Sequence, residues 1–406
     1  MKNSSSLSRR WAILAVGVAA MLFAGILYAW SILKNPFSAE LGFTASALAL
    51  NFTLTMCFFC LGGVVSSHLL RLMGTKLTII VSAVLAGCGF ILSGFLRGSS
   101  VLPLYITYAL MAGLGIGIAY IVIISTVNAW FPDRKGVSSG ALMMGFGASS
   151  LLLGNLADRL FQTEIGWRKT YMIIGVAICV VLALSALVIR RPPEDLALPA
   201  PKKNARFHGE DFEVRDYKPS EMIRRFTFWR AFICLVCITA VGSSVISFAR
   251  DLALSVGAEA ALATTLVGVL SVCNGLGRII TGALFDAMGR RFTMIAANIL
   301  TIAAAAGTLL AVSINSLPLC IVGLCLTGLS YGTSPTVSSA FTAAFYGQKY
   351  FAANLGISNC NLMAASFIAT ACSALQTASS SYTVPFILLL ALASFALILN
   401  ISIRRP

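Results

Sequence analysis

Long apolar runs recur along the whole chain, and they constrain its fold more than any other feature. A helix of roughly 20 residues crosses the hydrocarbon core of a bilayer. Twelve runs reach about that length, near residues 11–33, 44–69, 77–96, 103–129, 136–156, 171–189, 229–249, 260–284, 293–312, 317–343, 352–376 and 382–402. Because backbone polar groups in lipid must be hydrogen-bonded internally, such runs predict α-helices. The sequence therefore predicts an all-α membrane protein with twelve transmembrane helices.

The composition fits lipid as the main solvent. Charged residues make up 11% of the chain, against roughly 25% in soluble domains. A net charge of +15 would suggest a nucleic-acid partner in a soluble protein, but here its placement along the chain indicates membrane orientation. The first run is too long for the apolar region of a signal peptide, and no clear cleavage site follows it. We expect it to remain as the first helix.

One long polar stretch divides the runs into two sets of six. Residues 190–228 are rich in proline and mixed charge, which is typical of a linker. We expect a six-helix bundle at 1–189, a cytoplasmic linker at 190–228 and a second bundle at 229–406. With the N-terminus inside, most Lys and Arg residues fall on the cytoplasmic side, which favours two cytoplasmic termini. We expect the membrane to be the inner (plasma) membrane of a bacterium.

The two halves repeat each other. Residues 67–76, between the second and third runs, share their spacing of a small residue, a charged residue, a glycine and a terminal cation with residues 282–291, between the eighth and ninth. Residues 136–140 and 352–356 match in the same way at the start of the fifth and eleventh runs. Repeated halves around a central site are typical of secondary transporters.

The second copy resembles the signature loop of the major facilitator superfamily, which implies two pseudo-symmetric six-helix bundles and transport by alternating access. The loop residues are Gly282, Asp286, Gly289, Arg290 and Arg291. The first copy keeps Gly74 but has Arg71 where the family usually has an acid. In both loops the glycine permits a tight turn and the charges tie helix ends together, so we expect these residues to act in gating.

Three further stretches resemble a group within that superfamily, the bacterial oxalate/formate antiporters and monocarboxylate carriers. They are residues 25–31, 130–140 and 274–278. The resemblance implies a secondary transporter of small organic anions, by proton symport or by anion exchange. The chain has no phosphate-binding loop, no metal-ligand cluster and no paired acids. We therefore expect no enzyme activity, no cofactor and no metal.

Arg278 lies inside the eighth run, where an ionised arginine costs about 2.5–3.5 kcal/mol on insertion scales. It must face the bundle interior or a wet cavity. All 14 acids fall outside the predicted spans, so we expect Arg278 to bind a substrate carboxylate. The alternative is structural pairing to Asp286 or to backbone. Asn274 precedes it by one turn on the same face and is expected to orient the guanidinium or the substrate.

A single cation suits a single carboxylate. The resemblance implies a second cation, a lysine in the eleventh run, at a place that falls near Asn361 or Leu362 here; no Lys or Arg occurs in that run. A dianion would stay half-neutralised in a desolvated site, so we expect a monocarboxylate. A dicarboxylate antiporter of the oxalate/formate type, or an exporter of a non-anionic molecule, remains as an alternative. The expected partners are the small carboxylate and the bilayer, with no nucleic acid, and the carrier is expected to work as a monomer.

Aromatic and amide side chains complete the candidate site, although plain packing is the common role of any one aromatic in a membrane helix. Pro335 cannot donate to the carbonyl of Tyr331, which predicts a broken helix at that depth. Asn359 and Asn361 are polar within the eleventh run, with site and packing roles equally open. The substrate-contact candidates beside Arg278 and Asn274 are Tyr28, Trp30, Tyr120, Phe146, Tyr331, Asn359 and Asn361.

Overall fold

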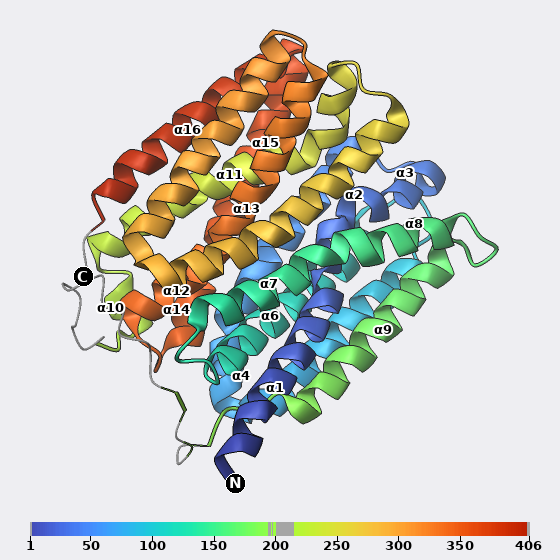
Figure 1. Ribbon diagram of the computed structural model, residues 1–406. Helices are drawn as coiled ribbons and strands as arrows, with labels where there is room; N and C mark the ends of the chain where they lie inside the picture. Colours follow the sequence, from blue (N-terminus) through green and yellow to red (C-terminus); the bar gives the residue numbers. More distant parts are fainter. Residues whose placement is uncertain (1, 194–195, 197, 200–214, 404–406) are drawn as a thin grey trace. The chain divides into compact units, whose positions relative to one another are not determined.

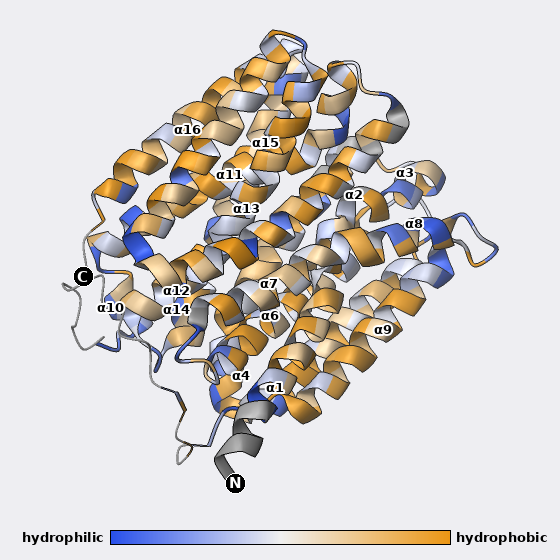
Figure 2. Cartoon of the chain, viewed as in Figure 1, coloured by the Kyte–Doolittle hydropathy of each residue, from blue (hydrophilic) through white to orange (hydrophobic). Residues whose placement is uncertain are grey.

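The computed structural model describes residues 2–193, 196, 198–199 and 215–403, and the regular elements of this part are helical (Figure 1). Ten of these helices are long and apolar enough to span a membrane. Two of the ten, α4 (Ala45–Gly94, 50 residues) and α12 (Ala260–Ser313, 54 residues), have about twice the length that one crossing needs. With both arms of these two helices counted, the twelve predicted spans are all present, and Figure 2 shows their apolar character. The predicted all-α membrane fold is confirmed.

The two long helices turn at equivalent glycines. Gly74 in α4 has φ 72° and ψ 176°, and Gly289 in α12 has φ 76° and ψ 179°. Only glycine adopts this region readily. One turn later, Thr78 Oγ1 donates to the Gly74 carbonyl at 2.7 Å, and Thr293 Oγ1 donates to the Gly289 carbonyl at 2.8 Å. The repeat found in the sequence thus extends to the backbone and to one side-chain hydrogen bond.

The chain divides into two compact units, which are described separately. The first unit is Met1–Glu213 together with Gln348–Cys360, and the second is Val214–Gly347 together with Asn361–Pro406. The predicted domain limits at residues 189 and 229 stay a prediction. The first unit holds α14, the first half of the eleventh span, which packs on α4 and α6. Its elements are α1 (Lys2–Ala24), the 3₁₀ segment η1 (Gly25–Ala29), α2 (Trp30–Leu33), α3 (Asn35–Leu41), α4, α5 (Leu102–Leu104), the π-helix η2 (Tyr105–Gly113), α6 (Leu114–Asn128), α7 (Lys135–Ser149), the π-helix η3 (Ser150–Gly154), α8 (Asn155–Phe161), α9 (Gly166–Val188) and α14 (Phe351–Ser358).

The second unit contains the remaining helices around an apolar core. Residues such as Val241, Leu252, Leu270 and Phe386 are buried together there. In the described part of the linker the chain forms the short helix α10, and α11 begins before the linker's predicted end. The elements of this unit are α10 (Pro219–Met222), α11 (Phe226–Ser255), α12, α13 (Leu317–Tyr346), α15 (Asn361–Ser379) and α16 (Thr383–Ile401).

One expectation about the second unit was wrong. Pro335 does not break its helix, because α13 runs continuously from Leu317 to Tyr346 with the proline inside. The residues around it, Tyr331 to Phe341, are all buried, and neighbouring groups in a membrane protein can satisfy the carbonyl that a proline leaves without a donor. The proline therefore lies within this helix and does not end it.

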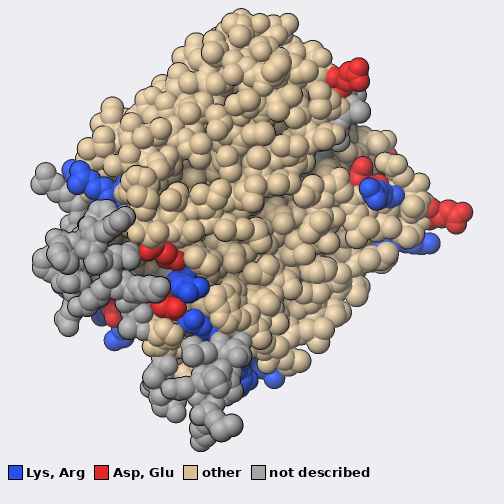
Figure 3. Space-filling view, viewed as in Figure 1, with Lys and Arg blue, Asp and Glu red and all other residues tan. Residues whose placement is uncertain are grey.

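Charged side chains lie mainly near the helix ends on the face that Figure 3 shows, and the flanks between them are uncharged. This distribution is what a bilayer requires, because a charge exposed to hydrocarbon is costly. The chain is thus an integral, multi-pass membrane protein.

Candidate functional site

Arg278 lies in the first arm of α12, within the second unit. Its side chain is almost fully buried, with 1% of its surface exposed. Its Nε donates a hydrogen bond of 3.1 Å to Oδ1 of Asn274, one turn earlier on the same helix. Asn274 is buried as well. The predicted pairing of these two residues on one helical face is therefore present, and the amide fixes the direction of the guanidinium.

Close contact between α12 and α13 determines where this pair lies. Glycine at 332 in α13 is required, because a Cβ there would overlap the backbone oxygen of Asn274 and lie 3.0 Å from the backbone nitrogen of Arg278. A Cβ at Gly277 would likewise overlap the carbonyl of Leu329. Tyr331 directly precedes Gly332 on α13 and so lies next to this crossing in the chain.

Tyr331 itself packs against α11. A Cβ at Gly242 would overlap its ring, so the absence of a side chain there makes room for the tyrosine. The ring is 4% exposed. The candidate residues of the second unit thus include one buried cation, one amide that orients it and one aromatic ring.

A buried arginine of this kind can bind an anion. The guanidinium is cationic and offers five N–H donors in a planar fork that matches a carboxylate. In a low-dielectric site this attraction is stronger than in water. The chemistry of the guanidinium therefore permits binding of a carboxylate group.

Four aromatic rings meet in the first unit. Phe146 of α7 lies 5.2 Å from Tyr28 and 5.1 Å from Tyr120, both edge-to-face. Phe59 of α4 completes the set, with its ring 5.2 Å from Tyr120 and 6.0 Å from Phe146. We call Tyr28, Phe59, Tyr120 and Phe146 the aromatic group. Three of its members were predicted from the sequence, and Phe59 was not.

Two glycines bring these rings together. A Cβ at Gly25 would overlap the carbonyl of Phe146, and a Cβ at Gly117 would overlap the carbonyl of Phe59. Each glycine precedes a tyrosine of the aromatic group, Tyr28 or Tyr120, by three residues. Residues three apart lie on the same side of a helix. Gly117, three residues before Tyr120, is a sequence signal for a close helix contact on that side of α6. It points to Phe59 only when the pairing of α6 with α4 is also known.

Tyr28 also lies in an irregular part of the first span. The helix tightens to 3₁₀ geometry over Gly25–Ala29, and a 3₁₀ stretch within a helix often marks a functional hinge. Trp30 follows this segment and belongs to a different set of rings. Its indole donates to the Leu48 carbonyl at 3.1 Å and its ring lies 4.6 Å from that of Tyr108. The structure does not bring Trp30 into the aromatic group.

The two asparagines of the eleventh span fall on either side of a break. A turn at 359–360 separates α14 from α15. Asn359 belongs to the first unit, where its carbonyl accepts a hydrogen bond of 3.3 Å from Cys60 Sγ. Asn361 is the first residue of α15 in the second unit. Both are buried, but they belong to different units.

The signature-loop residues surround the turn in α12. Gly282 is buried, Asp286 is half-buried, and Arg291 is exposed. The guanidinium of Arg290 lies 4.9 Å from the ring of Phe345 at the end of α13. In the first copy, Arg71 is exposed before Gly74. A cation–π contact thus joins the loop to α13. The expected role of the loop residues in gating stays a prediction.

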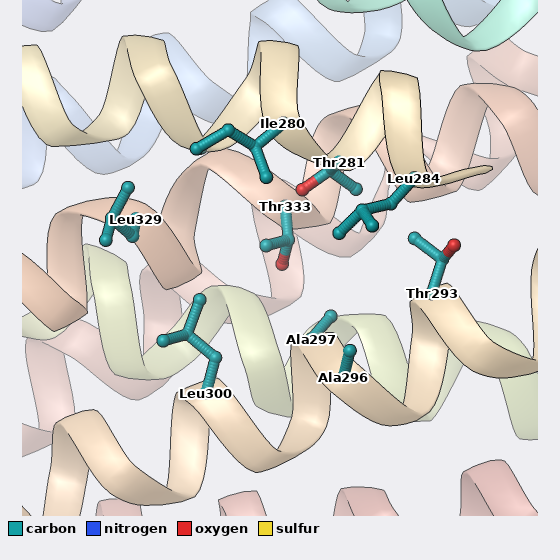
Figure 4. A pocket seen from close by; sticks show the side chains of 10 residues that line it. Ile280, Thr281, Leu284, Thr293, Ala296, Ala297, Leu300, Leu329 and Thr333 are labelled. Carbon is teal, nitrogen blue, oxygen red and sulfur yellow. The ribbon is translucent and has the colours of Figure 1, made fainter. Parts of the chain in front are cut away.

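A small cavity of about 120 Å³ opens between the two arms of α12 and α13 (Figure 4). Its walls are apolar apart from Thr281, Thr293 and Thr333. Neither Arg278 nor Asn274 lines it. The cavity is therefore separate from the candidate anion site. Within the described residues, His, Cys, Asp and Glu form no group of three or more that could hold a metal ion.

Comparison with known proteins agrees with the fold. The family model described as Major Facilitator Superfamily matches residues 12–369 and, again, residues 231–406. The proton:xylose symporter XylE, bound to 6-bromo-6-deoxy-D-glucose, superposes with a TM-score of 0.74 at 11% identity, covering 99% of this chain and 97% of that one. At this identity the likeness shows the fold alone.

Curated relatives cover much of the chain. An uncharacterized MFS-type transporter of Escherichia coli (strain K12), YhjX, is 25% identical over 358 residues, which are 88% of this chain and 86% of that protein. The oxalate:formate antiporter of Oxalobacter formigenes is 27% identical over 294 residues, 72% of this chain and 67% of that protein. Human monocarboxylate transporter 12 is 28% identical over 255 residues, 57% of this chain and 47% of that protein.

Proposed function

Since the chain belongs to the Major Facilitator Superfamily and is a transporter, not an enzyme, we propose that it carries small monocarboxylate anions by alternating access, with Arg278 binding the carboxylate. The observation that carries this proposal is the buried Arg278, whose Nε is oriented by Asn274. A buried cation at membrane depth is a functional feature by default, since its presence costs free energy that folding alone does not require.

The names of two relatives support an organic anion as the substrate. One is an oxalate:formate antiporter and the other a monocarboxylate transporter. The monoanion is favoured over the dianion by charge balance. The eleventh span, residues 351–379, has no lysine or arginine, so Arg278 has no second cation there to help it neutralise a dicarboxylate.

The charge on Arg278 also bears on the coupling mode. The guanidinium of Arg278 keeps its positive charge when no substrate is bound, whereas a bound carboxylate brings the site close to neutral. Because the loaded site is closer to neutral, it should cross the membrane interior more easily than the empty site. This favours exchange of one anion for another, or symport of an anion with a proton. Asn274 cannot accept the proton, because a neutral amide does not titrate.

The first experiment measures the thermal stability of the purified protein with small carboxylates. A ligand that binds only the folded state raises stability by about 2.7 kcal/mol at 100 times its Kd. We expect lactate- or pyruvate-sized monoacids to raise the unfolding temperature of the wild type. Arg278→Gln should lose this response, while Arg97→Gln, which removes an exposed arginine of the loop after α4, should keep it.

Transport by the same variants in proteoliposomes completes the test. We expect Arg278→Lys to be inactive despite its charge, because an ammonium lacks the planar fork of donors. Retained uptake in Arg278→Gln would show that Arg278 does not bind the substrate. A larger stabilisation by oxalate than by any monoacid would favour the dicarboxylate antiporter. No response to any carboxylate would favour a non-anionic substrate.

A further inference from the structure

The junction between the linker and α11 exposes apolar and cationic side chains together. We call residues 223–230 the foot of α11. Within it Phe226 is 82% exposed, Trp229 48% and Ile223 40%. Arg224, Arg225 and Arg230 are exposed in the same eight residues.

Exposed rings at a helix end are typical of the membrane–water interface. Large aromatic side chains left in water lose the free energy of burial, whereas tryptophan and tyrosine are enriched at the level of the lipid headgroups. The indole N–H of Trp229 is already satisfied, since it donates to the Ile223 carbonyl at 2.8 Å. Its ring is therefore fixed at the surface, where the acyl chains of lipids can cover it.

The described side chains of this surface carry a positive charge, and the described acids near it have other contacts. Glu221 lies 3.6 Å from Arg215 and accepts a hydrogen bond from the backbone of Lys218. Asp216 packs against Gly347, where a Cβ would overlap its carboxylate. After Glu221 the next acid in the sequence is Asp251, near the other end of α11. Within the described part of the chain, neither Arg224 nor Arg225 makes an ion pair with a carboxylate.

Arg225 is held in place by aromatic rings. Its guanidinium lies 5.6 Å from the ring of Tyr217, and that ring packs edge-to-face on Tyr346 at 5.7 Å. The backbone supports this arrangement, because Tyr217 N donates to the Tyr346 carbonyl at 3.0 Å. Arg230 is bonded to the Ser402 carbonyl at 2.9 Å. Arg224 and Arg225 are thus two exposed cations of the foot that a ligand can reach.

We propose that the foot of α11 binds the headgroup of an anionic phospholipid, with Arg224 and Arg225 on the phosphate oxygens. Phe226 and Trp229 lie among the upper acyl chains of the same leaflet, which the predicted orientation makes the cytoplasmic one. Charge complementarity selects the occupant: a phosphodiester with net negative charge fits two arginines, and the exposed rings require that it carry acyl chains. This site is independent of the substrate and does not involve Arg278.

The test uses the full-length protein in a neutral detergent, titrated with phosphatidylglycerol and, separately, with phosphatidylcholine of the same chain length. Native mass spectrometry counts the bound lipids. We expect the wild type to prefer phosphatidylglycerol. Arg224→Gln/Arg225→Gln should weaken its binding roughly thirty-fold, since each basic residue near an anionic surface contributes a factor of about five. Arg250→Gln, at the opposite end of α11, should leave the affinity unchanged.

Two further measurements keep the outcome clear if the double variant folds poorly. Arg224→Gln alone spares the contact between Arg225 and Tyr217 and should weaken binding about five-fold. In the wild type, raising the ionic strength should weaken phosphatidylglycerol binding, because salt screens exposed charges. Equal affinity for the two lipids, unchanged binding in Arg224→Gln, or binding that is insensitive to salt would each overturn the proposal. Binding of inorganic phosphate with the same affinity would show an anion site that does not recognise lipid, and would overturn it too.

Discussion

The side-chain oxygen of Asn274 accepts a hydrogen bond of 3.1 Å from Nε of Arg278, one turn later on α12. The amide is neutral, so it orients the guanidinium without cancelling its charge. An acid at the same place would form an internal ion pair. Replacing Asn274 with an acid therefore tests whether the positive charge of Arg278 binds the anion.

Asn274→Asp is expected to weaken anion transport at neutral pH, because the new carboxylate competes with the substrate for Arg278. Lowering the pH protonates the aspartate and frees the cation, so transport should recover as the pH falls. The measurement is the KM for a monocarboxylate in proteoliposomes at several pH values, with the isosteric wild type as reference. A variant whose KM matches the wild type at every pH would show that Asn274 is not close to the bound anion.

Gly332→Ala is expected to abolish transport and lower the unfolding temperature. The added Cβ would overlap the backbone oxygen of Asn274, and overpacking of this kind costs about 1–3 kcal/mol. Gly307→Ala in α12 is the matched control, since a Cβ there meets no atom within 4 Å. That change should be neutral, or stabilising by up to about 1 kcal/mol through helix propensity. If both variants behave alike, the close crossing of α12 and α13 does not position Arg278.

Arg10 and Asp133 form a buried ion pair in the first unit, and breaking it should be costly. Their side chains are 9% and 10% exposed, and Nη1 lies 2.8 Å from Oδ1. Removing Arg10 leaves the nearly buried Asp133 with the longer contact of 3.8 Å to Arg134 Nε, so Arg10→Gln should destabilise the protein by about 3 kcal/mol. Arg215→Gln, which opens the exposed pair with Glu221, should cost less than about 1 kcal/mol. Thermal unfolding compares the two, and the double variant Arg10→Gln/Asp133→Asn should be more stable than Arg10→Gln alone.

Gly74 and Gly289 should respond equally to substitution, because their backbone angles are the same within a few degrees. No atom lies within 4 Å of a Cβ at either place, so the cost is backbone strain alone, about 1–3 kcal/mol for each change to alanine. Asparagine should not relieve it. At Gly42, which is left-handed with φ 69° and ψ 22°, asparagine should be tolerated better than alanine. Apparent unfolding temperatures test this, and a neutral Gly289→Ala would contradict the assigned turn.

Much of the fold could be predicted from the sequence, because the membrane spans and their repeat depend on local properties of the chain. The length of an apolar run decides whether a helix can cross the bilayer, and the repeat at Gly74 and Gly289 is a matter of spacing. Arg278 could be identified for the same reason. An arginine inside an apolar run needs an interior environment whatever its neighbours are, and Asn274 lies one turn away on any regular helix.

Contacts between side chains of different helices could not be predicted from the sequence in this way. Tyr28 and Trp30 are two residues apart, and two such positions do not share a helical face. The first therefore meets Phe146 and the second meets Tyr108. Phe59 belongs to the aromatic group because Gly117 lets α4 approach α6 closely. The continuity of α13 at Pro335, where the surrounding residues are buried, was not predicted either. The sequence by itself determined the spans, their repeat and the buried cation, since these follow from hydropathy and local geometry. Only the tertiary structure decided which rings meet and which helix α14 packs on, since those contacts depend on close packing between segments that are far apart in the chain.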